Sequence, residues 1–118
     1  MPKVKFYQYA KCSTCVKARK FLESKSVKYT DFPIVENPPT KTELKKMLKS
    51  YDGEIKKLFN TSGVLYREMK IKDKIGSMSD TEAISLLSEN GKLIKRPFLV
   101  SDKALLVGFK EEEWKKSF

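Results

Sequence analysis

Residues 7–15 read Tyr7-Gln8-Tyr9-Ala10-Lys11-Cys12-Ser13-Thr14-Cys15, and they include both cysteines of this 118-residue chain. The segment Lys3–Tyr9 carries apolar side chains in an imperfect alternation, which predicts a first strand. From Ser13 to about Ser24 the apolar residues recur at the spacing of one helix face. The two cysteines therefore lie where a predicted strand gives way to a predicted helix.

A thiol at the start of this helix has special chemistry. Cys12 is expected near the N-cap, where the backbone amides of residues 13–15 have no partner inside the helix. Those amides and the positive end of the helix dipole lower a thiol pKa, and they can also hold an oxyanion. Cys15, one turn further, is the natural resolving thiol, and the pair can close a disulfide. We interpret the stretch as a redox or thiol-nucleophile site; the alternative interpretation is two buried, inert cysteines.

The absence of histidine limits the chemistry that this chain can perform. A Cys–His pair and a Ser–His–Asp triad are both excluded. A tetrahedral zinc site needs four protein ligands, or three and a water, and the chain has no second cysteine pair, so a metal is not expected. Any catalysis must use thiols, carboxylates, arginines, lysines or the backbone.

The formal net charge of +10 bears on the partners of the chain. It favours an oxyanion, nucleic acid or an acidic protein, although scattered lysines can equally serve only to keep a protein soluble. Neither a helix-turn-helix signature nor an aromatic–basic RNA motif is present, so direct nucleic-acid binding is not expected. Since the sequence has no run of about 18 apolar residues and no signal peptide, we expect a cytoplasmic protein without a membrane span.

The next part of the chain predicts a second strand and then several helices. Val27–Phe32 is expected to be the second strand, and it completes a βαβ unit whose two strands are parallel. Pro33 then begins a loop. In the helical region that follows, Thr40-Lys41-Thr42-Glu43 and Ser79-Asp80-Thr81-Glu82 are predicted capping boxes. Between these boxes lies a further predicted helix, at residues 64–70.

Strand signals return near the end of the chain. Residues 96–100 and 104–107 are apolar runs separated by a turn at 101–103, which indicates an antiparallel hairpin. A last helix is expected from Glu111, because acidic residues in a first turn suit the helix dipole, and Trp114 would pack it down.

This order of elements is the thioredoxin arrangement. It predicts an α/β fold with a mixed four-stranded sheet and a helical insertion between strands 2 and 3. We predict a single domain over residues 1–118. Its thioredoxin-like core is expected at residues 1–35 and 92–118, and the helical insert at residues 36–91.

Arg96 and Pro97 form the second element of the predicted site. In thioredoxin-like folds a proline leads into the third strand, often with a cis bond, and lies against the cysteine pair. Arg96 would then point toward Cys12, lower its thiol pKa and bind an anion in a bidentate way. The alternative interpretation is a surface arginine before an edge-strand proline.

These motifs together resemble a known family, the arsenate reductase-like (ArsC/Spx) family. It includes glutaredoxin-coupled arsenate reductases and the Spx regulators of Gram-positive bacteria. The resemblance covers nearly the whole chain and is closest to the Cys-x-x-Cys arsenate reductase-like proteins of Gram-positive bacteria. The segments that carry it, besides the cysteine pair and the insert, are Leu58–Gly63, Tyr66-Arg67, Asn90–Pro97 and Val107-Gly108-Phe109.

The resemblance implies how an oxyanion would be held. In the characterised glutaredoxin-coupled arsenate reductases one cysteine and three arginines surround it, and Cys12 and Arg96 match the cysteine and the middle arginine. Asn60 stands at the first arginine position, and the third falls near Gly108. Two missing arginines remove charge that would hold a multiply charged oxyanion. Arg67, one turn further along the insert, is the candidate substitute.

The predicted site therefore has two groups of residues. The catalytic group is Cys12, Cys15 and Arg96. The group that binds an anion or substrate is Ser13, Thr14, Asn60, Arg67 and Pro97. No metal ligand is predicted, and no cofactor is expected to be bound.

Two functions compete at this stage. In the first, the chain is a thiol-dependent oxidoreductase, in which Cys12 attacks an oxyanion or a disulfide and Cys15 resolves the adduct. An external thiol (thioredoxin, glutaredoxin or a low-molecular-weight thiol) would then reduce the disulfide. In the second, the chain is an Spx-like transcriptional regulator that binds RNA polymerase, and the cysteine pair is its redox sensor.

Overall fold

The computed structural model describes residues 4–102 and 104–118. Its four-stranded sheet has the order β2-β1-β3-β4, with β1 parallel to β2 and antiparallel to β3, and β3 antiparallel to β4. This is the mixed sheet that the sequence predicts. The strands are β1 (Lys5–Gln8), β2 (Thr30–Pro33), β3 (Phe98–Val100) and β4 (Leu105–Val107).

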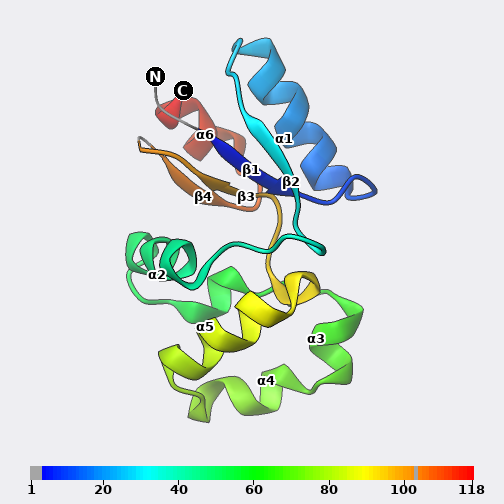
Figure 1. The fold of residues 1–118 in the computed structure, drawn as a ribbon, viewed down its shortest axis with the longest axis vertical. Helices are drawn as coiled ribbons and strands as arrows, with labels where there is room; N and C mark the ends of the chain where they lie inside the picture. Colours follow the sequence, from blue (N-terminus) through cyan, green and yellow to red (C-terminus); the bar gives the residue numbers. More distant parts are fainter. Residues whose placement is uncertain (1–3, 103) are drawn as a thin grey trace.

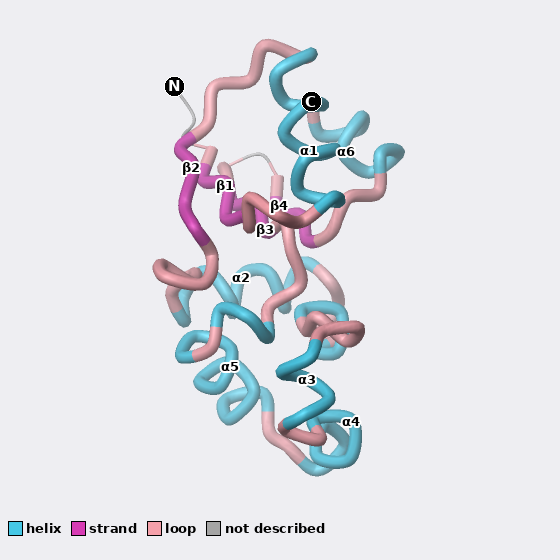
Figure 2. Tube along the Cα trace, turned by 90° about the vertical axis from the view of Figure 1, so that its right-hand side faces the viewer, coloured by secondary structure: helices cyan, strands magenta, loops and turns pink. Residues whose placement is uncertain are grey.

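Helices cover both faces of the sheet (Figure 1). One face carries α1 (Ser13–Ser24) and α6 (Glu111–Ser117), as Figure 2 shows from the side. The other face carries the helices of the insert, for which we keep the range 36–91. They are α2 (Lys41–Ser50), α3 (Val64–Glu68), α4 (Ile71–Lys74) and α5 (Asp80–Glu89), with the 3-10 turns η1 (Ile55–Leu58) and η2 (Ile75–Ser77). A third 3-10 turn, η3 (Gly91–Leu93), begins at the last residue of the insert. Among the described residues, no helix combines the length and apolarity needed to cross a lipid bilayer.

The central strand β1 sends alternate side chains into two apolar cores. In the sheet register Phe6 lies beside Leu99 of β3, and Tyr7 lies beside Phe98. Phe6 and Leu99 belong to the core under α1 and α6, whereas Tyr7 and Phe98 belong to the core shared with the insert. Both faces of β1 are therefore covered, and its two edges are paired with β2 and β3, so it is an interior strand of the sheet.

Trp114 anchors α6 to the sheet, as predicted. Its ring is completely buried and meets Phe6 and Phe21 edge-on, with ring centroids 6.4 and 6.1 Å apart. Its indole N–H donates to the backbone carbonyl of Gly108, with an N···O distance of 3.1 Å. The buried donor is therefore satisfied, and the burial of this large ring stabilises the helix without leaving an unpaired polar group.

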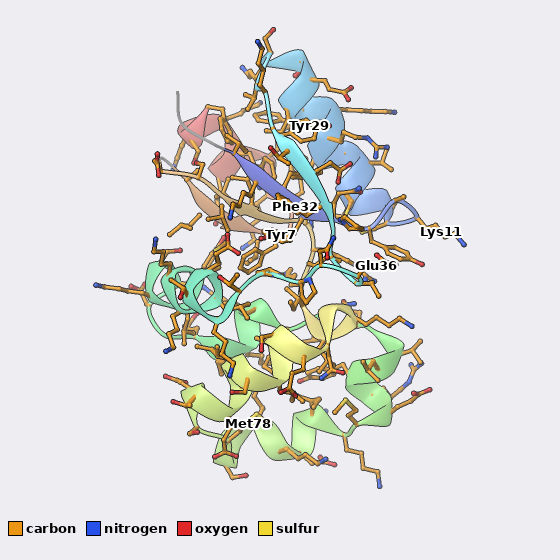
Figure 3. The ribbon with its side chains drawn as sticks, in the orientation of Figure 1. Tyr7, Lys11, Tyr29, Phe32, Glu36 and Met78 are labelled. Carbon is orange, nitrogen blue, oxygen red and sulfur yellow. The ribbon has the colours of Figure 1, made fainter. Side chains whose placement is uncertain are left out.

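A partly buried network ties β1 to the insert, beside the stacked rings of Tyr7 and Phe32 (Figure 3). The Tyr7 hydroxyl donates to one carboxylate oxygen of Glu43 at 2.8 Å, and the Lys5 ammonium contacts the other at 3.2 Å. The backbone N–H of Thr40 donates to the same carboxylate at 3.0 Å, which completes the predicted capping box of α2. Burial alone would raise the pKa of Glu43, but these donors outweigh it and hold the pKa below its usual value.

The second predicted capping box, at the start of α5, is only half formed. The Ser79 hydroxyl accepts a hydrogen bond from the backbone N–H of Glu82 at 3.1 Å, as the motif requires. The Glu82 carboxylate, however, accepts from the Ser79 hydroxyl rather than from the Ser79 backbone N–H. The motif still marks the helix start, because one side-chain cap satisfies an amide of the first turn.

The second strand begins later than predicted, at Thr30 rather than at Val27. Ser26 has a left-handed backbone with φ 56°, and the N–H of Val27 bonds back to the carbonyl of Leu22 in α1. These residues therefore close the helix instead of pairing with β1. The apolar character of Val27 reflects packing against the α1 side of the sheet, which the alternation pattern could not distinguish from a strand.

The second strand also ends later than predicted, because Pro33 is its last residue and not the start of a loop. Thr30 donates its N–H to the carbonyl of Val4, just before β1, and Ile34 donates its N–H to the carbonyl of Gln8 in β1. Successive backbone nitrogens of a strand point to opposite edges, so the nitrogen of Pro33 points away from β1 to the free edge of the sheet. No hydrogen-bond donor is needed there.

The helix predicted at residues 64–70 is interrupted. α3 ends at Glu68, and Lys70 takes a left-handed conformation with φ 54° and ψ 41° before α4 begins. This turn brings the buried side chain of Ile71 into the core shared with the sheet. Two predicted positions, the strand start at Lys3 and the turn residue Lys103, lie outside the described residues.

We predict that Tyr7→Phe lowers the free energy of unfolding by about 1.5 kcal/mol at pH 7, because it removes a buried hydrogen bond to a charged carboxylate and leaves the ring packing intact. The measurement is urea unfolding followed by far-UV circular dichroism.

The matched control is Tyr29→Phe, because the Tyr29 hydroxyl makes no hydrogen bond among the described residues. Its unfolding free energy should stay within about 0.5 kcal/mol of the unmodified chain. Equal losses in the two variants would show that the Tyr7–Glu43 hydrogen bond does not stabilise the fold.

Candidate active site

Cys12 is the N-cap of α1, as predicted. β1 ends at Gln8, and a turn closed by a hydrogen bond from the Cys12 N–H to the Tyr9 carbonyl, at 3.0 Å, leads into the helix. The exposed side chain of Lys11 in this turn points into solvent (Figure 3). The Cys12 carbonyl accepts the first helical hydrogen bond, from the N–H of Val16. The backbone N–H groups of the first turn of α1 consequently have no acceptor inside the helix and are available to the Cys12 thiol.

The Cys12 thiol is half-buried and has a lowered pKa. Burial by itself raises the pKa, because a thiolate loses solvent. The thiolate is favoured by hydrogen bonds from Cys15, through both its backbone N–H and its thiol, and from the backbone N–H of Thr14. The positive charge of Arg96 favours it as well, and these effects together outweigh burial. Of the three amides predicted to act here, the structure places those of Thr14 and Cys15 at the thiol. Ser13 is exposed, and its amide is not among these donors.

The pKa of Cys15 is shifted in the opposite direction, upward. Its side chain is 0% exposed, and burial is the main cause that raises its pKa to about 12. The Tyr9 N–H, 3.5 Å from the Cys15 sulfur, and the charge of Arg96 act against burial, whereas the hydrogen bond to Cys12 and the negative charge on Cys12 add to it. Both thiols are free. One helical turn thus holds a thiol that ionises easily and a thiol that stays protonated.

Backbone hydrogen bonds on both sides hold Arg96 at this place. The N–H of Lys95 donates to the carbonyl of Leu58 at 2.8 Å, which fastens the segment to the end of η1. The carbonyl of Pro97 accepts from the N–H of Gly108, also at 2.8 Å. The Arg96–Pro97 peptide bond is cis, as predicted, and Pro97 is buried.

The Arg96 side chain contacts a residue to which we assigned no role from the sequence. Its Cζ atom lies 4.8 Å from the centre of the Tyr9 ring. From this position the half-buried guanidinium lowers the pKa of Cys12 and counteracts the rise at Cys15. The sequence signal that could have indicated this contact is an aromatic residue just before a cysteine pair in a site that also expects an arginine.

Asn60 and Arg67 do not act on the Cys12 thiol in the described part of the chain. The half-buried Asn60 donates its N–H to the Leu93 carbonyl at 2.7 Å, and its side chain fills the space beside Gly63. Arg67 is exposed on α3 and lines a surface pocket of about 320 Å³ with other residues of the insert. The role of both residues in anion binding stays a prediction.

The backbone at Gly108 explains why no side chain extends from the predicted third arginine position. Gly108 has φ +68°, a left-handed conformation that strains any other residue. A Cβ atom there would also lie 2.8 Å from Cε of Lys95. Among the described residues, Arg96 is the cation whose charge lowers the pKa of Cys12.

The two thiols permit a two-step exchange reaction. Cys12 can attack first because it ionises more easily, and Cys15 can attack the Cys12 sulfur because the two thiols already lie within hydrogen-bonding reach. Within the part of the chain that the structure describes, no three His, Cys, Asp or Glu side chains gather as a metal site would require.

Several known proteins are similar to this chain over most of its length. The model of the ArsC family matches residues 7–117 of this chain. The uncharacterized protein YusI of Bacillus subtilis (strain 168) is 42% identical over 113 residues, which are 96% of this chain and 96% of YusI. The global transcriptional regulator Spx 2 of Bacillus anthracis is 31% identical over 113 residues, which are 96% of this chain and 85% of Spx 2. A solved structure from Streptococcus mutans UA159, described as a possible arsenate reductase, is 38% identical with a TM-score of 0.89, and the match covers 98% of both chains.

We predict that iodoacetamide alkylates Cys12 in the folded chain and leaves Cys15 unmodified at pH 8. Since the thiolate is the reactive form and the Cys12 pKa is lowered, the rate should rise with pH and level off with a midpoint below that of a free thiol, about 8.5. The measurement is quenched alkylation with mass spectrometry of the peptide that contains both cysteines.

Two controls complete this experiment. In denaturant both cysteines should react, because the burial of Cys15 is lost. In Arg96→Met the midpoint of Cys12 should move upward, because one stabilising charge is removed. A Cys12 midpoint at or above that of the denatured chain would contradict a thiolate stabilised by the helix amides and by Arg96.

Proposed function

The chain belongs to the ArsC family, and from this premise we propose that it is a thiol-dependent oxidoreductase. Cys12 is the nucleophile and Cys15 is the resolving thiol. The observation that carries the proposal is the placement of the two thiols within one helical turn, with Cys12 half-buried at the N-cap of α1 and Cys15 completely buried. This difference in burial and hydrogen bonding shifts the pKa of Cys12 downward and the pKa of Cys15 upward. An attacking and a resolving thiol need this difference, because only the thiolate attacks.

With a disulfide substrate, the Cys12 thiolate attacks one substrate sulfur. A bond forms between the two sulfurs, the substrate S–S bond breaks, and the other half leaves as a thiolate that takes up a proton. Cys15 then loses its proton and attacks the Cys12 sulfur, which releases the second half as a thiolate. Two electrons have passed to the substrate, and the chain is left with a Cys12–Cys15 disulfide.

An oxyanion of the arsenate kind is the other substrate class. The Cys12 sulfur would displace one oxygen, which leaves as water after protonation, and the attack of Cys15 on Cys12 would release the central atom reduced by two electrons. The donors of Arg96 and the Thr14 amide are suited to the remaining oxygens. Of the three arginine positions, the middle one alone holds an arginine here, Arg96. We therefore expect slower turnover of this substrate than the resemblance to arsenate reductases alone implies. The similarity to the Streptococcus mutans protein favours retaining this class.

The protein disulfide must be reduced before the next turnover. An external thiol (thioredoxin, glutaredoxin or a low-molecular-weight thiol) can do this without any bound cofactor. Cys12 is the half-buried member of the pair and Cys15 is fully buried, so the reductant should attack the Cys12 sulfur. Cys15 is then the leaving group and takes a proton back.

We predict that serine replacements separate the two steps. Cys12→Ser should lower turnover of a disulfide substrate by about 10³-fold or more, because no nucleophile remains. Cys15→Ser should still react once and accumulate a mixed disulfide at Cys12, visible as an added mass in intact-protein mass spectrometry. Turnover is followed as the consumption of reductant with thioredoxin, glutaredoxin and glutathione systems.

Arsenate is assayed in parallel with the disulfide substrate, using the same reductants and variants. The proposal fails if no cysteine-dependent turnover of either substrate appears with any reductant. Wild-type turnover in Cys15→Ser would contradict the resolving role of Cys15 alone.

A second candidate function, a redox-sensing transcriptional regulator, is favoured by the 31% identity with Spx 2. In this function the Cys12–Cys15 disulfide is the signal and not an intermediate of turnover. RNA polymerase would be the partner, and the net charge of +10 would suit an acidic surface on it.

The regulatory candidate predicts redox-dependent binding to purified RNA polymerase. The chain oxidised with diamide should bind the polymerase at least about tenfold more tightly than the reduced chain, and Cys12→Ala should abolish this difference. The measurement is biolayer interferometry with immobilised polymerase. Identical binding in both redox states would remove this candidate, whereas it would leave the oxidoreductase proposal unaffected.

A further inference from the structure

Tyr9 and Arg96 lie opposite each other beyond the end of the sheet. β1 and β3 are antiparallel, with Tyr7 beside Phe98. Tyr9 is two residues further along the chain from Tyr7, and Arg96 is two residues before Phe98, so the same register places them opposite each other. The distance of 4.8 Å between Cζ of Arg96 and the centre of the Tyr9 ring is that of a cation–π contact.

The backbone of Tyr9 is tied to both cysteines. Its carbonyl accepts the N–H of Cys12 at 3.0 Å, and its N–H donates to the sulfur of Cys15 at 3.5 Å. The Tyr9 ring therefore has a defined position relative to both sulfurs. The contact with this ring transfers that position to Arg96 and offsets the rotamer entropy that its long side chain loses when it is held in one place.

The contact leaves the guanidinium able to bind an anion. Among residues 4–102 and 104–118, the side chain of Arg96 has no carboxylate at ion-pair distance and donates no hydrogen bond. An aromatic ring occupies only the face of a guanidinium, whereas a carboxylate would occupy its edge donors and cancel its charge. Arg96 therefore keeps both its charge and its donors beside Cys12.

We propose that Tyr9 is a positioning residue, which holds Arg96 at the cysteine pair so that its free edge receives a negatively charged group of the substrate. The inference rests on the proposed thiol function of Cys12 and adds a substrate class to it. Substrates with an anionic group next to the atom that Cys12 attacks should react faster than neutral substrates of the same reactivity. Arsenate-like oxyanions belong to this class, as do disulfides that carry a carboxylate close to the sulfur.

The test compares two alkylating reagents that differ in charge, iodoacetate and iodoacetamide, on the reduced full-length chain. In both reactions the Cys12 sulfur displaces iodide, and the ratio of the two rate constants reports the positive charge at the site. Because the same thiolate attacks both reagents, this ratio cancels any change in the thiolate fraction. The rates are measured by mass spectrometry at Cys12, and the protection of Cys15 verifies in each variant that the turn is folded.

We predict that Tyr9→Leu lowers the iodoacetate-to-iodoacetamide ratio by about three- to tenfold, the loss expected when a cation–π contact no longer holds the arginine. Tyr9→Phe keeps the ring and is the matched control, so its ratio should stay within about twofold of the unmodified chain. Tyr9→Met is measured alongside, so that the comparison survives if one of the two ring-free variants does not fold.

A double variant shows whether Tyr9 acts through the arginine. Arg96→Met should lower the ratio at least as much as Tyr9→Leu, and adding Tyr9→Leu to Arg96→Met should lower it no further. The inference is overturned if the ratio of a folded ring-free variant equals that of the unmodified chain. It is also overturned if Tyr9→Leu still lowers the ratio in the absence of Arg96.

The alkylation experiment tests the positioning role of Tyr9 separately from the proposed function, because alkylation needs neither substrate nor reductant. The predicted ratios without any enzymatic turnover would refute the oxidoreductase proposal and support the positioning role of Tyr9. Turnover combined with an unchanged ratio in Tyr9→Leu would refute the positioning role and support the oxidoreductase proposal.

Discussion

β1 is an interior strand, so both of its edges must be paired and both of its apolar faces must be covered. The positions of the other strands and helices follow from this constraint. Phe6 requires a cover on one face, which α1 and α6 provide through Trp114, and Tyr7 requires a cover on the other, which the insert provides. The parallel strand β2 and the antiparallel strand β3 take up its two edges. The carboxyl end of β1 then delivers the chain to Cys12, and the same antiparallel register brings Arg96 alongside. The site is thus a consequence of how this one strand is covered.

The insert contributes to the site although it supplies none of the groups at the thiols. The Tyr7–Glu43 hydrogen bond fastens α2 to the sheet, and the pairing of Lys95 with Leu58 fastens the chain just before Arg96. Because the insert is anchored to β1 on one side and to the approach to β3 on the other, it limits where Arg96 can lie.

How much of this could be predicted depended on the range of the interactions. The N-cap position of Cys12 follows from local spacing, and the Thr40–Glu43 capping box does as well, because both involve residues within one turn. The predicted bounds of β2 and the predicted helix over residues 64–70 were wrong, because tertiary contacts override propensity there. Tyr9 received no role from the sequence, since its contact with Arg96 joins residues that only the sheet register brings together.

The sequence by itself determined the order of the strands and helices, the position of the cysteine pair at a helix start and the membership of the ArsC family. These properties reside in short motifs and in periodicity, which act over a few residues. Only the tertiary structure decided how the two cysteines differ and which cation accompanies them. Burial separates the acidities of Cys12 and Cys15, and burial is a property of the packed chain. The sheet register places Arg96 at the cysteine pair, while the left-handed backbone at Gly108 strains any residue other than glycine there.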